Sequence, residues 1–189
     1  MYELDHALRV MSGGGGSGLL HWISELDPVE NAGPSHNLAT LVFDSFGRLS
    51  KEQIAEVIWK DDHSGARPIH WAAQSGALHL LKMFLHNDTK QYIKYLPIPG
   101  VEKTDDDDVM QDETSFIDPV NCVDDKNESP LFYSILLGKY ECVDYLISQG
   151  ADVNIVSKES GFSPLHLATV NHHPQIVGLL IDNVREFIE

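Results

Sequence analysis

The sequence predicts an all-α protein whose helices stack in pairs to form a solenoid. Three observations support this fold class. A short proline-containing motif occurs three times, its last two copies lie 34 residues apart, and apolar residues at helical spacing follow each copy. Because one helix pair alone leaves an apolar face open to water, neighbouring pairs must stack to bury a common core.

The motif places a proline where a helix is expected to begin. Pro68, Pro130 and Pro164 suit a first helical turn, because the missing N–H costs nothing there. Gly150 follows the second apolar segment and is predicted to end a helix in a left-handed turn. The three copies comprise residues 67–73 with Leu80, Leu81, Phe84 and Leu85; residues 129–132 with Cys142, Val143, Leu146 and Ile147; and residues 163–168 with Ile176, Val177, Leu179 and Leu180.

These segments resemble the ankyrin repeat, whose signature combines a T-P-L-H-x-A-A helix start with a G-A-D-V-N turn. The turn occurs unchanged at residues 150–154, and the resemblance covers residues 62–87 and 117–183. It implies an ankyrin-repeat solenoid of stacked helix pairs with short β-hairpin fingers. It also implies a role in binding other proteins.

The three copies differ at the position of the motif histidine and at other motif positions. The resemblance implies that His70 and His166 hydrogen-bond neighbouring loops. In the second copy Phe132 replaces this histidine and Ile135 replaces an alanine. In the third copy His172 stands where the family usually has glycine.

The motif spacing predicts how residues 19–189 are organised. Pro68 and Pro130 are 62 residues apart, which exceeds the ankyrin period of about 33. The excess predicts one long acidic inter-repeat loop. A degenerate fourth repeat is a weaker alternative, because the segment lacks the Ala-Ala of a helix start. The predicted segments are a capping repeat at 36–60, a repeat at 62–87, the acidic insertion at 88–116, and repeats at 117–154 and 158–183.

The capping repeat is predicted as two helices, at residues 36–46 and 51–60. Ser50 and Gln53 have the spacing of a capping box at the start of the second helix. Such a repeat would cover the stacking face of the first true repeat. Residues 19–26 are predicted to add a further short helix.

The N-terminal residues resemble an added ligand joined by a fusion linker. Residues 12–18 read SGGGGSG, a composition typical of a flexible, engineered linker. Residues 1–11 then form a candidate partner peptide, whose apolar stripe on a helix consists of Leu4, Ala7, Leu8 and Met11. The alternative is an expression leader with incidental amphipathicity.

Composition limits the classes of partner. With 13 basic and 29 acidic residues and a net charge of −16, the chain lacks the basic excess that binding to nucleic acid or an anionic membrane requires. We expect no direct nucleic-acid or membrane partner, and a monomeric domain. The two cysteines suit a reducing compartment, so we expect nuclear or cytoplasmic localisation.

No catalytic or metal-binding motif is recognisable. The four consecutive aspartates at 105–108 lack the alternating spacing and glycine turn of a calcium loop. His172 and His173 have no partner at zinc spacing. We therefore expect no enzyme activity, no cofactor and no metal site.

The resemblance to ankyrin repeats also implies a concave partner-binding face. Family-typical positions on the first helices and fingers include several apolar side chains, and an exposed apolar row indicates a binding groove. The candidate partner-binding residues are Trp71, Gln74, Ser75, Glu128, Tyr133, Leu136, Leu137, Phe162, Leu167, Val170 and Asn171. Two alternatives remain: the acidic insertion covers this row, or the peptide binds the capping helices near Leu38 and Val42.

We therefore expect a scaffold or regulatory protein whose ankyrin groove binds a short helical segment of a partner, here residues 1–11. The alternative is binding of basic tails, such as those of histones, by the acidic loop. The segment 70–73 and the long insertion are also similar to fungal cell-cycle transcription regulators with ankyrin regions, a hint towards the nucleus.

Overall fold

The computed structural model describes residues 50–86 and 118–186, together with positions 20, 21, 23, 40 and 44. The predictions for residues 1–18, for the acidic insertion at 88–116 and for most of the helix at 36–46 lie outside the described residues.

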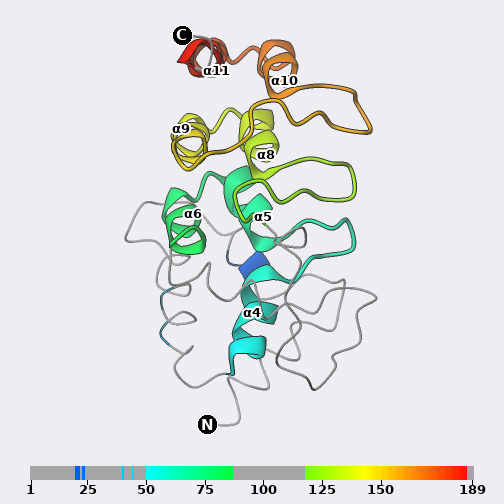
Figure 1. Ribbon diagram of the computed structural model, residues 1–189, viewed down its shortest axis with the longest axis vertical. Helices are drawn as coiled ribbons and strands as arrows, with labels where there is room; N and C mark the ends of the chain where they lie inside the picture. The colour runs from blue at the N-terminus through cyan, green and yellow to red at the C-terminus, as the bar shows by residue number, and fades with distance from the viewer. Residues whose placement is uncertain are drawn as a thin grey trace.

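The described helices stack as pairs, which confirms the predicted solenoid. Figure 1 shows the first helix of each pair in one column and the second helix in a neighbouring column, and helices within each column contact one another. The pairs are α5 (Pro68–Ser75) with α6 (Leu78–Phe84), α8 (Pro130–Leu136) with α9 (Tyr140–Ser148), and α10 (Pro164–Val170) with α11 (Pro174–Glu186).

The N-terminal side of the first pair is covered by further helical residues. Helix α4 (Lys51–Trp59) begins with the predicted capping box, in which the Ser50 hydroxyl accepts from the backbone N–H of Gln53 and the Gln53 side chain accepts from that of Ser50. Helical Leu20 and Ile23 are buried in the same core cluster as α4 and the repeats. This arrangement shields the stacking face of the first pair.

The first helices start as the motif predicts. Pro68, Pro130 and Pro164 each occupy the first helical turn. The Ser129 and Ser163 hydroxyls precede the second and third of them and accept a backbone N–H from the first turn. Local sequence therefore sets where these helices begin.

The turn between the two helices of a pair requires a left-handed residue. Gly76 and Gly138 have φ angles of 86° and 65° at this position. His172 occupies the same position in the third pair with φ 58°, so a histidine takes the conformation that glycine adopts without a steric penalty.

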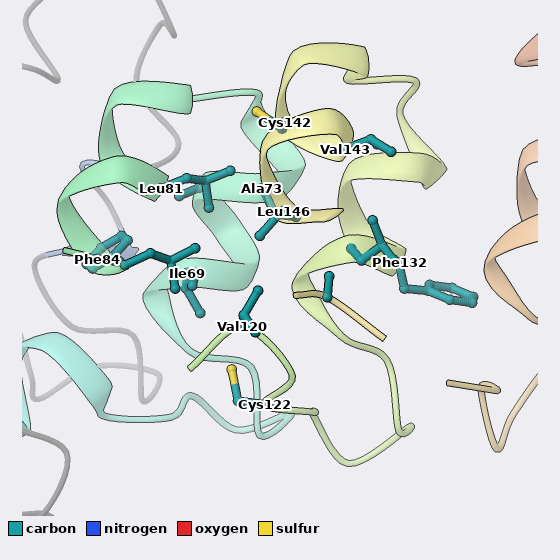
Figure 2. Packing of buried hydrophobic residues seen from close by; sticks show 14 of the residues in the cluster. Ile69, Ala73, Leu81, Phe84, Val120, Cys122, Phe132, Cys142, Val143 and Leu146 are labelled. Carbon is teal, nitrogen blue, oxygen red and sulfur yellow. The ribbon is translucent and has the colours of Figure 1, made fainter. Parts of the chain in front are cut away.

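The core lies between the two columns of helices. Figure 2 shows Ile69 and Ala73 of α5, Leu81 and Phe84 of α6, and Leu146 of α9 within it. All of these side chains are buried and belong to one cluster that extends to the last pair. One core therefore runs through the stack, as expected for a repeat protein.

The prediction of β-hairpin fingers is wrong for the residues that the structure describes, because turns occupy these loops and no strand is found there. In Figure 1 the loops extend on the side opposite the second helices. The Asp124 Oδ1 atom accepts from the backbone N–H groups of Lys126 and Glu128. Side-chain carboxylates thus satisfy backbone donors that a strand ladder would otherwise use.

Candidate functional site

The first helices present a common face, which we call the inner strip. On each helix this face consists of residues at i, i+3 and i+4, which lie on one side of a helix. The inner strip comprises Trp71, Gln74 and Ser75 of α5; Tyr133, Leu136 and Leu137 at the end of α8; and Leu167, Val170 and Asn171 at the end of α10. Since α5 packs against α8 and α8 against α10, the three faces are neighbours.

Within the inner strip, apolar exposure is concentrated at the C-terminal ends of α8 and α10. The exposed fractions are 39% for Leu136, 51% for Leu137 and 56% for Val170, whereas Gln74 and Ser75 are half-buried. The solvent exposure predicted for Leu136, Leu137 and Val170 is therefore confirmed. These three side chains form the apolar part of the inner strip.

Leu167 does not belong to the accessible surface, so its assignment as a partner-binding residue is wrong. Its exposed fraction is 5%, and it is part of the core cluster against which Phe162 packs. Packing into this core removes its apolar surface from water, which stabilises the buried position. Trp71 and Tyr133, at the equivalent positions of α5 and α8, are only half-buried.

Trp71 and Tyr133 are half-buried and bind the finger loops that precede their helices. The Trp71 Nε1–H donates to Asp62 Oδ2 at 3.1 Å. The Tyr133 hydroxyl donates to Asp124 Oδ2 at 2.9 Å. Both aromatic side chains therefore stabilise their fingers and mark the finger side of the inner strip.

The two finger aspartates organise their loops in the same way. Asp62 Oδ1 accepts from the backbone N–H groups of Ser64 and Ala66, as Asp124 Oδ1 does from its own loop. Burial raises the pKa of Asp62, but hydrogen bonds from Ser64, Trp71 and Ala66 outweigh it, so this pKa lies below its ordinary value. Asp62 is therefore ionised at neutral pH.

The sequence analysis missed these aspartates. A usable signal is present, because Asp62 and Asp124 each lie six residues before the helix-starting proline, whereas the third repeat has Lys158 there. An aspartate before a short loop commonly binds the loop's own N–H groups. The role of Asp62 and Asp124 in holding Trp71 and Tyr133 is visible only in the structure.

Glu128 lies half-buried between the second and third fingers. Its Oε1 accepts from the Ser157 hydroxyl at 2.8 Å. Burial first, then the nearby Asp124 charge, raise the pKa of Glu128 above its ordinary value, although the Ser157 hydrogen bond opposes this. The Lys126 Nζ lies 2.6 Å from Glu159 Oε2 and joins the same two fingers.

The remaining finger residue of the predicted site is Phe162. It is half-buried, and its ring stacks on that of His166 with centroids 6.3 Å apart. Phe162 therefore covers the third helix pair more than it offers a free binding surface.

Both motif histidines bond to their own helix starts, and His70 also lies beside backbone groups of Cys122 and Glu128 in the neighbouring finger, which oppose the lowering of its pKa. The Arg67 backbone N–H donates to His70 Nδ1 at 3.0 Å, and the Ser163 hydroxyl oxygen lies 2.7 Å from His166 Nδ1. His70 is fully buried and His166 is exposed. Burial and the Arg67 charge lower the pKa of His70 to about 3.

The chemistry available in the described residues is limited. Cys122 and Cys142 are unpaired and buried, and burial raises the pKa of each thiol to about 12. Neither thiol is therefore a nucleophile at neutral pH. Among the described residues, His, Cys, Asp and Glu side chains form no group of three or more that would hold a metal ion.

None of the helices in the described part of the chain has the length and hydropathy that a membrane crossing requires.

The stacked helix pairs, proline-initiated first helices and finger loops define a helical-repeat protein of the ankyrin type. The family described as ankyrin repeats (3 copies) matches residues 103–188. The chain therefore contains ankyrin repeats, as the sequence analysis predicts. This family is in general a protein–protein interaction module.

One similar protein is the human transient receptor potential cation channel subfamily A member 1. It is 36% identical to this chain over 131 residues, which cover 61% of the chain and 11% of that protein. The chain thus corresponds to a small part of this relative.

Proposed function

We propose that the ankyrin repeats bind a helical segment of a partner protein through the inner strip. The family match supports a role in protein binding, and the inner strip supplies a candidate surface. The observation that carries the proposal is the exposure of Leu136, Leu137 and Val170 on adjacent, mutually packed first helices.

An apolar row of this kind suits an amphipathic helix. Fully burying one leucine or valine side chain contributes about 1.5–3 kcal/mol, so covering three half-exposed side chains contributes a few kcal/mol. A partner helix with apolar residues at i, i+4 and i+7 presents a matching stripe. A weak complex of this size would benefit from a high local concentration of its ligand.

Residues 1–11 are the candidate ligand within the chain itself. Leu4, Leu8 and Met11 have the spacing of one helical stripe. The seven residues at 12–18 span at most about 25 Å, which limits how far the segment reaches. A tether of this length raises the effective ligand concentration to roughly millimolar.

The test is a calorimetric titration of the free peptide of residues 1–11. The protein is the full chain carrying Leu8→Asp, which places a charge on the stripe of its own N-terminal segment and prevents competition. We expect saturable one-to-one binding, because the free peptide retains the intact stripe. A second substitution, Leu136→Asp, should weaken this binding at least tenfold, since it places a charge on the inner strip.

Ile181→Asp is the matched control, because Ile181 is 38% exposed, close to the exposure of Leu136, but lies on the second helix α11. Circular dichroism should show that both variants remain folded. Equal weakening by the two substitutions, or no binding up to about 1 mM peptide, would refute the proposal.

A further inference from the structure

We propose that residues 1–11 occupy the inner strip of their own chain in one direction, with Met11 on α8 and Leu4 on α10. This inference rests on the proposed function and adds the direction and register in which the strip takes a helix. Two features carry it: the place where the tether of these residues is anchored, and the spacing of the first helices.

The tether is anchored at the α5 end of the inner strip. His21 is buried, its Nε2 lies 3.1 Å from the Ala66 carbonyl oxygen, and its ring centroid lies 6.4 Å from that of the strip residue Trp71. Leu20 has no exposed surface and belongs to the core cluster. In Figure 1 the blue residues near position 20 lie between α4 and α5. The chain that leads to residues 1–11 therefore starts next to the strip, before its first helix.

The length of the tether limits where Met11 can lie. Met11 and Leu20 are nine positions apart, so the chain between them spans at most about 30 Å, and about 15–18 Å on average as a glycine-rich coil. Packed helices lie about 8–10 Å apart, so from Leu20 the helix α8 is two spacings away, about 20 Å, and α10 is three, about 30 Å.

These lengths favour one direction of binding. A coil reaches α8 near its average extension, whereas α10 requires a fully extended chain. The effective concentration of a tethered ligand is highest when the average length of its tether matches the span. Met11, where the tether begins, therefore belongs on α8, and the rest of the segment continues away from α5.

The register follows from the spacing of the stripe. On a helix Leu4 lies about 10 Å from Met11, which matches the distance between two packed helices. Leu8 and Met11, one turn apart, then face the two exposed leucines of α8, and Leu4 faces Val170 of α10. The residues of the inner strip carry no formal charge, and neither do these three side chains, so a chain of net charge −16 offers its own segment a surface without repulsion.

Calorimetric titration of the free peptide of residues 1–11 tests whether the strip is occupied. The unsubstituted chain should bind this peptide at least twofold more weakly than the Leu8→Asp chain, since its own segment competes at roughly millimolar effective concentration. Deletion of residues 13–17 is the matched control, because it keeps the stripe but leaves Met11 and Leu20 four positions apart, a reach of about 14 Å. The shortened chain should bind the free peptide as tightly as the Leu8→Asp chain does.

Disulfide trapping in a glutathione redox buffer tests the direction. A chain with Met11→Cys and Leu137→Cys should form an intramolecular disulfide about fivefold faster than a chain with Met11→Cys and Val170→Cys, because the effective concentration is higher at α8. Leu4→Cys should show the opposite preference. The two native cysteines are buried, and mass spectrometry of the digested chains identifies the pair that forms.

The outcomes separate this inference from the proposed function. Equal affinities of the unsubstituted and Leu8→Asp chains for the free peptide would overturn the inference. So would equal or reversed disulfide preferences, no disulfide in any pair, or disulfide-linked dimers in place of intramolecular bonds. In these cases binding of the free peptide to the Leu8→Asp chain that is sensitive to Leu136→Asp would leave the proposed function standing. Failure of the free peptide to bind that chain would refute both.

Discussion

At the scale of single residues, the side chain at one motif position decides whether the stability of the fold depends on pH. His70 and Phe132 occupy the same position of the first and second copies and are both buried. His70 accepts one backbone hydrogen bond, and burial keeps it neutral with a pKa of about 3. A histidine that remains neutral in the fold but is protonated in the unfolded chain makes stability depend on pH.

We predict that His70 destabilises the fold as the pH falls below about 6.5. The unfolded chain then binds a proton that the native state does not bind down to a pH of about 3, so the free energy of unfolding decreases with falling pH. Between pH 7 and pH 5 the contribution of this group is about 2 kcal/mol. Urea unfolding at both pH values should show a smaller loss for His70→Phe, which introduces the residue found at position 132.

The other nine histidines are present in both proteins, so the difference between the two losses isolates His70. Equal losses for the wild-type chain and the variant would contradict the burial of a neutral His70.

At the scale of elements, the finger loops are held by side chains of their own repeat and of the neighbouring repeat. Asn121 Oδ1 accepts from the Asp152 backbone N–H at 2.7 Å, and its Nδ2 donates to the Gly150 carbonyl at 3.2 Å. These bonds connect the loop before α8 to the turn that follows α9, within the repeat predicted at 117–154. Asn154, 33 residues later, makes no side-chain hydrogen bond within the described residues.

We predict that Asn121→Ala lowers the free energy of unfolding by about 1–2 kcal/mol, because two backbone groups lose their partner. Amide hydrogen exchange at Asp152 should become faster. Asn154→Ala is the matched control, and its effect should stay within about 0.5 kcal/mol. Similar costs for both substitutions would mean that the Asn121 bonds contribute nothing specific.

At the scale of the whole molecule, burial depends on whether a further repeat covers a position. Leu131 and Leu165 both follow the helix-starting proline, yet Leu131 has no exposed surface and Leu165 is 39% exposed. Helix α8, which carries Leu131, has α10 packed against it. Within the described part of the chain no helix packs over the outer face of α10 in this way.

We predict that Leu131→Ala costs about 2–5 kcal/mol, as expected for a cavity in a packed core. Leu165→Ala removes the same atoms but should cost less than about 1 kcal/mol, because much of the side chain already contacts water. Urea unfolding of the two variants measures the difference. Comparable costs would show that the outer face of α10 is covered in solution.

Local features of this chain are predictable from sequence because they depend on neighbours along the helix. Pro68, Pro130 and Pro164 begin helices since their ring suits the first turn. The Ser50–Gln53 capping box forms within four residues. The exposure of Leu136, Leu137 and Val170 agrees with what the resemblance to ankyrin repeats implies, whereas Leu167, assigned in the same way, is buried.

The sequence by itself determined the helix pairs, their register and the family to which these repeats belong. Only the tertiary structure decided that Leu167 is buried, that Trp71 and Tyr133 bind finger aspartates, and that turns replace strands in the described fingers. The physical reason is distance. Caps and periodicity act within a few residues, whereas burial and hydrogen bonding depend on side chains that stacking brings together from other parts of the chain.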